Sequence, residues 1–161
     1  MRSGGRGILY FQRDNRIHAY DLRSSTERVI YASPAPPGDF GGFDVRRADG
    51  TLLVLVTADR GSGCIVRLVT TAGVAVDRQR LPGACFGAAW SHDGTRILAA
   101  TADREPQLWL LEHEGGAPAR LPISSDVFWD LSVSPDGREL LFSAGNPRPT
   151  AVILRGLSQP R

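Results

Sequence analysis

The chain of 161 residues has no lysine, and all 19 of its basic side chains are arginines. Together with the abundance of alanine, glycine and proline, this bias is typical of a protein from a high-GC, bacterial genome. The 19 basic residues are balanced by 17 acidic ones, and neither sign forms a run. Because nucleic-acid and membrane-surface footprints need clustered positive charge, neither partner is expected.

Long hydrophobic runs are also missing. The longest strongly apolar run, residues 52–56, has about five residues, whereas a helix that spans a bilayer needs roughly 20. No apolar segment of the signal-peptide type follows Met1. With 42% apolar and 22% charged residues, the composition is that of an ordinary globular chain, so we expect one folded domain with a real core.

Residues that carry chemistry are scarce. The three histidines, His18, His92 and His113, are too far apart for the spacing of metal ligands. No Gly-x-Ser-x-Gly elbow is present, and residues 60–63 form a loop between expected strands. No helix follows Gly61-Ser62-Gly63 to hold a phosphate at its N-terminus. The sequence therefore predicts no catalytic site, no metal and no cofactor.

An internal repeat is the strongest feature of the sequence. Asp-Gly recurs at 49–50, 93–94 and 136–137, with a spacing of 44 and then 43 residues, and Gly4-Gly5 occupies the same slot upstream. Short strands recur around each Asp-Gly, with an aromatic-rich strand ahead of it and no helical period anywhere. The expected strands are 8–11, 17–22, 28–31, 40–45, 52–56, 65–69, 76–81, 86–90, 97–100, 108–111, 118–121, 128–133, 140–142 and 151–154.

A four-stranded unit that repeats every 40 to 45 residues is typical of a β-propeller blade. The sequence thus predicts an all-β fold, with one propeller domain over 1–161 and blades at 1–37, 38–83, 84–123 and 124–161. Counted from the axis, we expect the first blade to begin at its second strand and the last to end after its third. The ring is then incomplete or open.

An open ring exposes strand edges that ring closure removes. The first explanation is that the chain is part of a larger protein. The second is that two copies form a homodimer that completes a ring of eight blades. A strained ring of four blades in a monomer is the third.

The turns favour hairpins between the first two strands of each blade. In Ser134-Pro135-Asp136-Gly137, proline suits the second position and glycine the positive φ that follows aspartate. Residues 91–94 have the same pattern without the proline. Residues 46–50 have one extra residue before the glycine, which we expect a bulge to absorb.

Residues 90–98, followed by 101–104, 108–111 and 115–121, resemble the repeat of TolB-like β-propellers, in which Ser-Pro-Asp-Gly, an Asp-Arg turn and Gly-Gly-x-Pro recur. Residues 134–142 match its first half, and 57–60 repeat the turn, whereas 145–147 depart from it. A WD40-like repeat fits less well, because Trp129-Asp130 lies in the innermost strand. The resemblance implies a non-enzymatic module that binds or scaffolds a protein or peptide. It also leaves open the propeller domain of a prolyl-oligopeptidase-type serine hydrolase, with its catalytic domain outside this chain, or a sensor domain of a signalling protein.

The candidate ligand-binding residues lie on one loop face and at the mouth of the channel. By the repeat, the two Asp-Arg turns lie on the same face, and adjacent Phe128 and Trp129 cannot point the same way on a strand. The alternative is that these charged residues only stabilise turns and form surface ion pairs, each of which contributes at most about 1 kcal/mol to stability. The candidates are Asp59, Arg60, Asp103, Arg104, Trp129 and Asp130.

The two cysteines allow two states. Cys64 opens the third strand of the second blade and Cys85 enters the third blade, on loops of the same propeller face, so a disulfide is possible. That bond stabilises by about 3 kcal/mol in the chain-entropy estimate, and it implies an oxidising, extracytoplasmic compartment. The alternative is two buried, free thiols.

Overall fold

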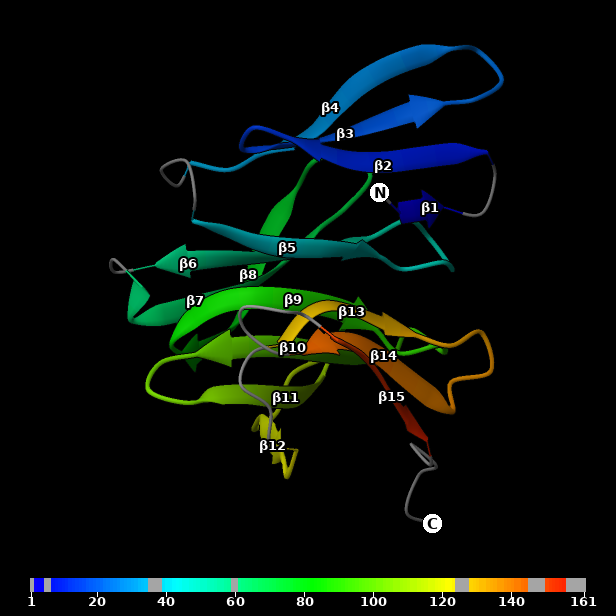
Figure 1. Cartoon of the computed structure of the whole chain (residues 1–161). Helices are drawn as coiled ribbons and strands as arrows, with labels where there is room; N and C mark the ends of the chain where they lie inside the picture. Colours follow the sequence, from blue (N-terminus) through cyan, green and yellow to red (C-terminus); the bar gives the residue numbers. More distant parts are fainter. Residues whose placement is uncertain are drawn as a thin grey trace.

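Runs of apolar residues broken by tight turns fold into four antiparallel sheets, each built from consecutive strands (Figure 1). The computed structural model describes residues 2–4, 7–34, 39–58, 61–123, 128–144 and 150–155. The first sheet contains β1 (Arg2–Gly4), β2 (Ile8–Arg13), β3 (Arg16–Asp21) and β4 (Thr26–Ala32); the second contains β5 (Phe40–Val45), β6 (Leu52–Ala58), β7 (Gly63–Val69) and β8 (Ala75–Pro82). The third contains β9 (Ala84–Trp90), β10 (Arg96–Ala102), β11 (Pro106–Glu112) and β12 (Ala119–Leu121); the fourth contains β13 (Phe128–Val133), β14 (Glu139–Ala144) and β15 (Thr150–Arg155).

Each sheet lies inside one of the four repeat units and follows the order of a propeller blade, from the innermost strand outward. The innermost strands contact one another in chain order, β1 with β5, β5 with β9 and β9 with β13. The first and last sheets lie at opposite ends of this row, so the blades form an open arc (Figure 1).

The first blade differs from the prediction, because it does have an innermost strand. β1 pairs with β2 through three residues, from Arg2 opposite Tyr10 to Gly4 opposite Ile8. The sequence missed this strand because Arg-Ser-Gly has no apolar alternation. Gly4, expected in a turn, lies in the strand, while Gly5 falls outside the described residues.

The Asp-Gly turns have the predicted backbone. The φ angle is +79° at Gly50, +70° at Gly94 and +72° at Gly137, in the region that glycine adopts without strain. The N–H of Gly94 and the N–H of Gly137 each donate to the carbonyl three residues earlier, at 3.0 and 2.9 Å. These are the hydrogen bonds of a tight β-turn.

The turn at residues 46–50 contradicts the expected bulge. Its glycine N–H donates to the carbonyl four residues earlier, that of Arg46, at 2.9 Å. The flanking strands nevertheless pair at Val45 and Leu52, with the same spacing as Trp90 and Ile97 in the next blade. The loop has the same length as its equivalents, because the extra residue before the glycine is matched by one residue fewer after it.

Three apolar cores fill the spaces between successive sheets. Side chains alternate along β6, so that Leu52 and Val54 pack toward the first sheet, whereas Leu53 and Leu55 pack toward the third. All four are fully buried. The third core, between the third and fourth sheets, is centred on residues such as Phe128. A strand that is buried on both faces reads as a continuous apolar run, which explains residues 52–56.

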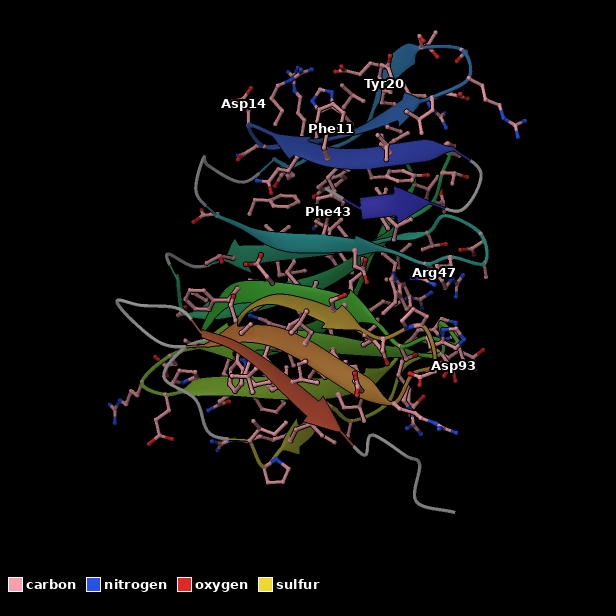
Figure 2. All side chains as sticks on the ribbon, turned by 45° about the vertical axis from the view of Figure 1, so that its right-hand side comes forward. Phe11, Asp14, Tyr20, Phe43, Arg47 and Asp93 are labelled. Atoms are coloured by element: carbon pink, nitrogen blue, oxygen red, sulfur yellow. A yellow bond between two sulfur atoms is a disulfide. The ribbon has the colours of Figure 1, made fainter. Side chains whose placement is uncertain are left out.

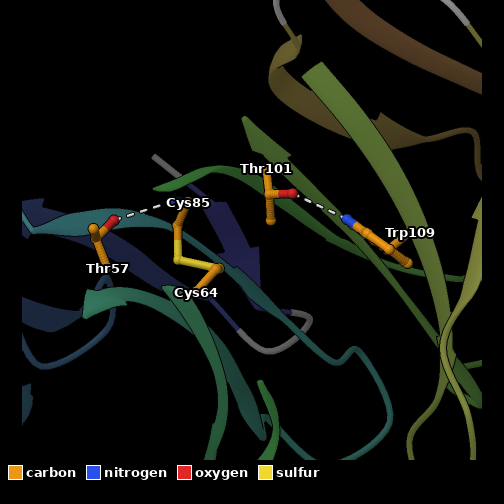
Figure 3. The surroundings of a disulfide bond; sticks show 5 residues. All are labelled: Thr57, Cys64, Cys85, Thr101 and Trp109. Carbon is orange, nitrogen blue, oxygen red and sulfur yellow. Dashed lines mark hydrogen bonds between the residues drawn. A yellow bond between two sulfur atoms is a disulfide. The ribbon is translucent and has the colours of Figure 1, made fainter. Parts of the chain in front are cut away.

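A disulfide joins Cys64 on β7 to Cys85 on β9, with a Cα–Cα distance of 5.1 Å (Figure 3). Both residues are buried in the core between the second and third sheets. The N–H of Cys85 also donates to the hydroxyl oxygen of Thr57 on β6, at 3.1 Å. Of the two states that the sequence allowed, the structure has the disulfide, and this bond ties two neighbouring blades together.

Candidate functional site

A groove runs along the innermost strands of the second, third and fourth sheets and along β2 of the first sheet. It encloses about 260 Å³. Every sheet contributes to its wall, and the described lining residues are Phe11, Gln12, Gly42, Phe43, Phe86, Gly87, Ala88, Asp130 and Leu131. We call this site the axial groove. It corresponds to the central channel of a closed propeller, of which four blades in an open arc form only a part.

A β-bulge in each of three successive innermost strands shapes the axial groove. On β5, Gly41 is the extra residue between the pairs Phe40–Val56 and Gly42–Leu55. On β9, Phe86 is the extra residue between the pairs of Cys85 and Gly87, and on β13 two residues, 130 and 131, stand where the partner strand has one. Because a bulge interrupts the alternation of side chains, it redirects residues from the cores toward the groove.

Glycines let the innermost strands approach each other closely at these bulges. A Cβ on Gly41 would lie 2.1 Å from the Cβ of Cys85, a distance that non-bonded carbon atoms do not tolerate. A Cβ on Gly87 would lie 3.0 Å from the side chain of Leu131 on β13. The backbone of the groove is therefore held at a spacing that larger residues would prevent.

Asp130 is the single charged side chain among the described residues of the groove lining. It is exposed, and its φ of +50° is an unusual value for a residue other than glycine. The hydroxyl of Ser143 on β14 donates to its carboxylate at 3.3 Å. A positive φ at an exposed residue is a departure from the relaxed backbone that often marks a functional position.

The structure separates the candidate residues from one another. Asp130 lies in the axial groove, as expected for the channel mouth. Trp129 pairs with Ser143 through its backbone, and its side chain lies outside the described part of the chain. Asp103 and Arg104 are exposed on the turn between β10 and β11 and do not line the groove. Asp59 and Arg60 are outside the described residues, so their predicted position stays a prediction.

Sequence reasoning missed most of the groove. The aromatic residues Phe43 and Phe86 were recognised only as part of the innermost strands, where most of them were expected to fill the core. The pairs Gly41-Gly42 and Phe86-Gly87 were the available signal, because glycine inside a strand often marks a bulge or a close approach.

A second hollow of about 340 Å³ lies between the third and fourth sheets. Leu98, Leu110, Leu121 and Val133 line it together with polar residues of the Asp-Gly turns at 91–96 and 136–138. The aspartates of these turns are held locally. Hydrogen bonds from the hydroxyl of its own turn's serine and from the N–H of Thr95 lower the pKa of Asp93 to about 2. Since these polar groups already have partners in the turns, the axial groove is the better candidate site.

The histidines have different surroundings. His18 is buried, and its Nδ1 lies 2.7 Å from the carboxylate of Glu27. His92 is exposed on a turn, while the ring of His113 lies edge-on to Trp90 at 6.1 Å between centroids. Within the described segments, no three His, Cys, Asp or Glu side chains gather closely enough to hold a metal ion. In the same segments there is no helix whose length and apolarity would let it cross a membrane.

No family model and no curated protein matches the sequence. The fold is similar to that of several solved structures. TolB from Acinetobacter baumannii superposes with a TM-score of 0.69 at 14% identity, over 92% of this chain and 37% of TolB. A nidogen/laminin complex gives a TM-score of 0.73 at 14% identity, over 92% of this chain and 57% of that chain. Hydrazine synthase from Kuenenia stuttgartiensis gives 0.73 at 16% identity, over 96% and 51%.

The three similar structures have low sequence identity to this chain and unrelated names, so the similarity shows a fold and not an activity. The chain spans between 37% and 57% of the length of the three proteins. TolB is among them, but it is not more similar than the other two. Together with the four sheets and their strand order, the comparisons establish a β-propeller module made of four consecutive blades.

Proposed function

We propose that this β-propeller is a non-enzymatic, TolB-like binding module, part of a larger protein, whose axial groove holds an extended segment of a protein or peptide. The observation that carries the proposal is the axial groove itself, where three sheets present their innermost strands, and the first sheet its strand β2, to one space. Each innermost strand is the end of its sheet, so one of its edges has no neighbouring strand in that sheet. Main-chain donors and acceptors at such edges suit the backbone of an extended peptide.

The lining adds one preference to main-chain recognition. The carboxylate of Asp130 offers a partner for one basic side chain. We therefore expect an extended segment with an arginine or lysine. That one solved structure of similar fold is a complex of nidogen with laminin agrees with a role in protein binding.

Two other functions remain weaker. The propeller domain of a prolyl-oligopeptidase-type serine hydrolase needs a catalytic domain outside these residues, and a sensor domain needs a signalling partner outside them. The fold is also similar to the tricorn protease, with a TM-score of 0.63 at 16% identity, but the chain spans only 14% of that protein. No feature of the axial groove favours either function over binding.

The buried disulfide supports a place for the protein in an oxidising compartment, such as the periplasm or the cell exterior. Disulfides persist in such compartments, whereas the reducing cytosol keeps most thiols free. Expression with and without export, followed by mass spectrometry of alkylated protein, tests this location. Full oxidation only after export supports it, and full oxidation in the cytosol contradicts it.

Selection of a random peptide display library on the intact chain tests the groove. We expect the selected peptides to contain a basic residue. Asp130→Asn should weaken their binding about tenfold or more, because a hydrogen bond to a charged group is worth about 1.5–3 kcal/mol. Asp103→Asn removes an equally exposed carboxylate outside the groove and should leave affinity unchanged. Equal binding by wild type and Asp130→Asn would contradict the proposed site.

A further inference from the structure

We propose that two copies of this chain associate head to tail, with the outer face of the fourth sheet of one copy packed on the outer face of the first sheet of the other. Two such contacts, related by a two-fold axis, would close eight blades into one ring. The proposal concerns the ends of the arc and does not depend on what the axial groove binds. It requires that the rest of the larger protein proposed above adds no blade to the ring.

The outer face of the fourth sheet has no blade packed on it, and comparison with equivalent positions of the repeat makes this visible. In the second sheet, Leu53 lies opposite Leu68, and both are buried by the third sheet, at 0% and 6% exposure. In the fourth sheet, the equivalent cross-strand pair is Leu141 and Ile153. They are 43% and 52% exposed. The equivalence holds because Leu53 and Leu141 each come directly after the residue that closes the first hairpin of the blade, in the pairs Val45–Leu52 and Val133–Leu140.

In the third sheet, the equivalent pair is covered by the sheet that follows it in the chain. Its equivalent pair is Leu98 and Leu110. Leu98 is 4% exposed and packs in the core shared with the fourth sheet, with Leu110 packed against it. Wherever a following blade exists, the β6 or β10 member of this pair is thus buried, and its partner is buried or half-buried. A large apolar pair exposed at this position is a blade interface without its second half.

The outer face of the first sheet is also apolar. Leu9 lies opposite Tyr20, and Val29 lies opposite His18, on the side away from the second sheet. Figure 2 shows Phe11 and Tyr20 on this outer side, and Phe43 between the first and second sheets. Val29 is 48% exposed. On the equivalent face of the second sheet, Val54 is fully buried against the first sheet.

The charges of this face are already paired with one another. Arg13 forms a salt bridge with Glu27, and Glu27 also lies 2.7 Å from Nδ1 of His18. The ring of His18 stacks on that of Phe11, with 5.2 Å between centroids. The face is therefore apolar with a neutralised polar cluster, and it suits a partner without charge. On the fourth sheet, the exposed pair is flanked by the uncharged Ser132 and Ser143, and by Glu139, which lies on the same face two residues before Leu141.

A second copy satisfies both faces at once. The two faces lie at opposite ends of the arc (Figure 1), so each copy offers one face of each kind. A contact between unlike faces closes only if the rotation per blade completes a circle. Four blades from each copy give eight, which lies within the range of closed propellers. Closure would also remove both unpaired ends of the row.

Mass in solution, by light scattering during gel filtration, tests the association. We expect twice the chain mass of 17.4 kDa for the wild type. Leu141→Arg and Val29→Glu should each halve the mass with an unchanged circular dichroism spectrum, because both side chains are exposed in the single chain. Val76→Arg is the matched control: it charges an equally exposed valine, 45% accessible, on the outermost strand of the second sheet, and should leave the dimer intact.

Mixing the Leu141→Arg and Val29→Glu variants gives the sharpest readout. In a mixed pair, one contact places the introduced arginine beside the introduced glutamate and the other contact is wild type, so the mixture should regain the dimer mass. Ile153→Arg serves as a second variant of the same face if Leu141→Arg does not fold. A wild-type mass of 17.4 kDa at 100 µM, a mass above two copies, or variants that stay dimeric alone would each overturn the proposal.

Discussion

Replacement of both Cys64 and Cys85 by alanine is expected to lower the free energy of unfolding by about 3 kcal/mol. The two residues are separated by 21 positions, and the bond between them restricts that loop in the unfolded chain. The loop-entropy relation gives roughly 11 cal/mol/K for a loop of this length, which is about 3.3 kcal/mol at 25 °C. The alanines themselves fit the core without added volume, so the loop supplies most of the effect.

Equilibrium unfolding in urea, followed by tryptophan fluorescence at one fixed protein concentration, measures the change. The double variant should unfold at lower urea with little change in slope, and a reducing agent should not shift it further. Reduced wild type should match the variant. Because the sulfurs are buried, at 0% and 6% residue exposure, reduction of the native protein should be slow unless denaturant opens the core.

The loop argument fails if oxidised and reduced wild type unfold within about 0.5 kcal/mol of each other. It also fails if the single variants Cys64→Ala and Cys85→Ala differ greatly from the double variant under reducing conditions. In that case packing around one residue, and not the closed loop, would account for the stability.

Three further predictions concern single features of the fold. Gly41→Ala should destabilise by about 3 kcal/mol in urea, because its Cβ would meet β9, whereas Gly63→Ala, which meets only the end of a flexible arginine, should change stability little. The indole N–H of Trp109 donates to the hydroxyl of Thr101 at 3.0 Å (Figure 3). A double-mutant cycle of Trp109→Phe with Thr101→Val should give a coupling free energy near 1 kcal/mol, and a coupling near zero would show that this hydrogen bond does not stabilise the fold. Since the pKa of Asp93 is lowered from 3.8 to about 2, the stability it contributes is present above about pH 4 and lost as the pH falls toward 2; Asp93→Asn should reduce the decline of the urea midpoint over that range, and an unchanged decline would contradict this role.

The repeat in the sequence predicted the architecture because its signals are local and recur. An Asp-Gly turn requires a positive φ at glycine, and three such turns at nearly equal spacing are compatible with few folds. The approach of Cys64 to Cys85 followed from the same reasoning, since the repeat places their loops on one face. That the chain has four sheets in blade order was therefore predictable from residue patterns alone.

The axial groove was less predictable because it depends on irregularity. A bulge shifts one strand by one residue against its partner, and nothing in an apolar–polar pattern indicates where that shift occurs. Asp130 was found only because Phe128 and Trp129 are adjacent on one strand. β1 was missed since three polar or small residues can pair with a neighbour without any hydrophobic pattern.

The three separate cores have a consequence for how the protein opens. Each core is shared by two sheets only, so the blades couple to their neighbours and not to the whole, as in a linear array of repeats. The sheets at the two ends each have one such core, while the inner two have two each. In a single open chain, amide hydrogens of the end sheets should therefore exchange with solvent first, and those of β6 and β10 last. In a closed ring every blade has two neighbours, and this gradient along the chain disappears.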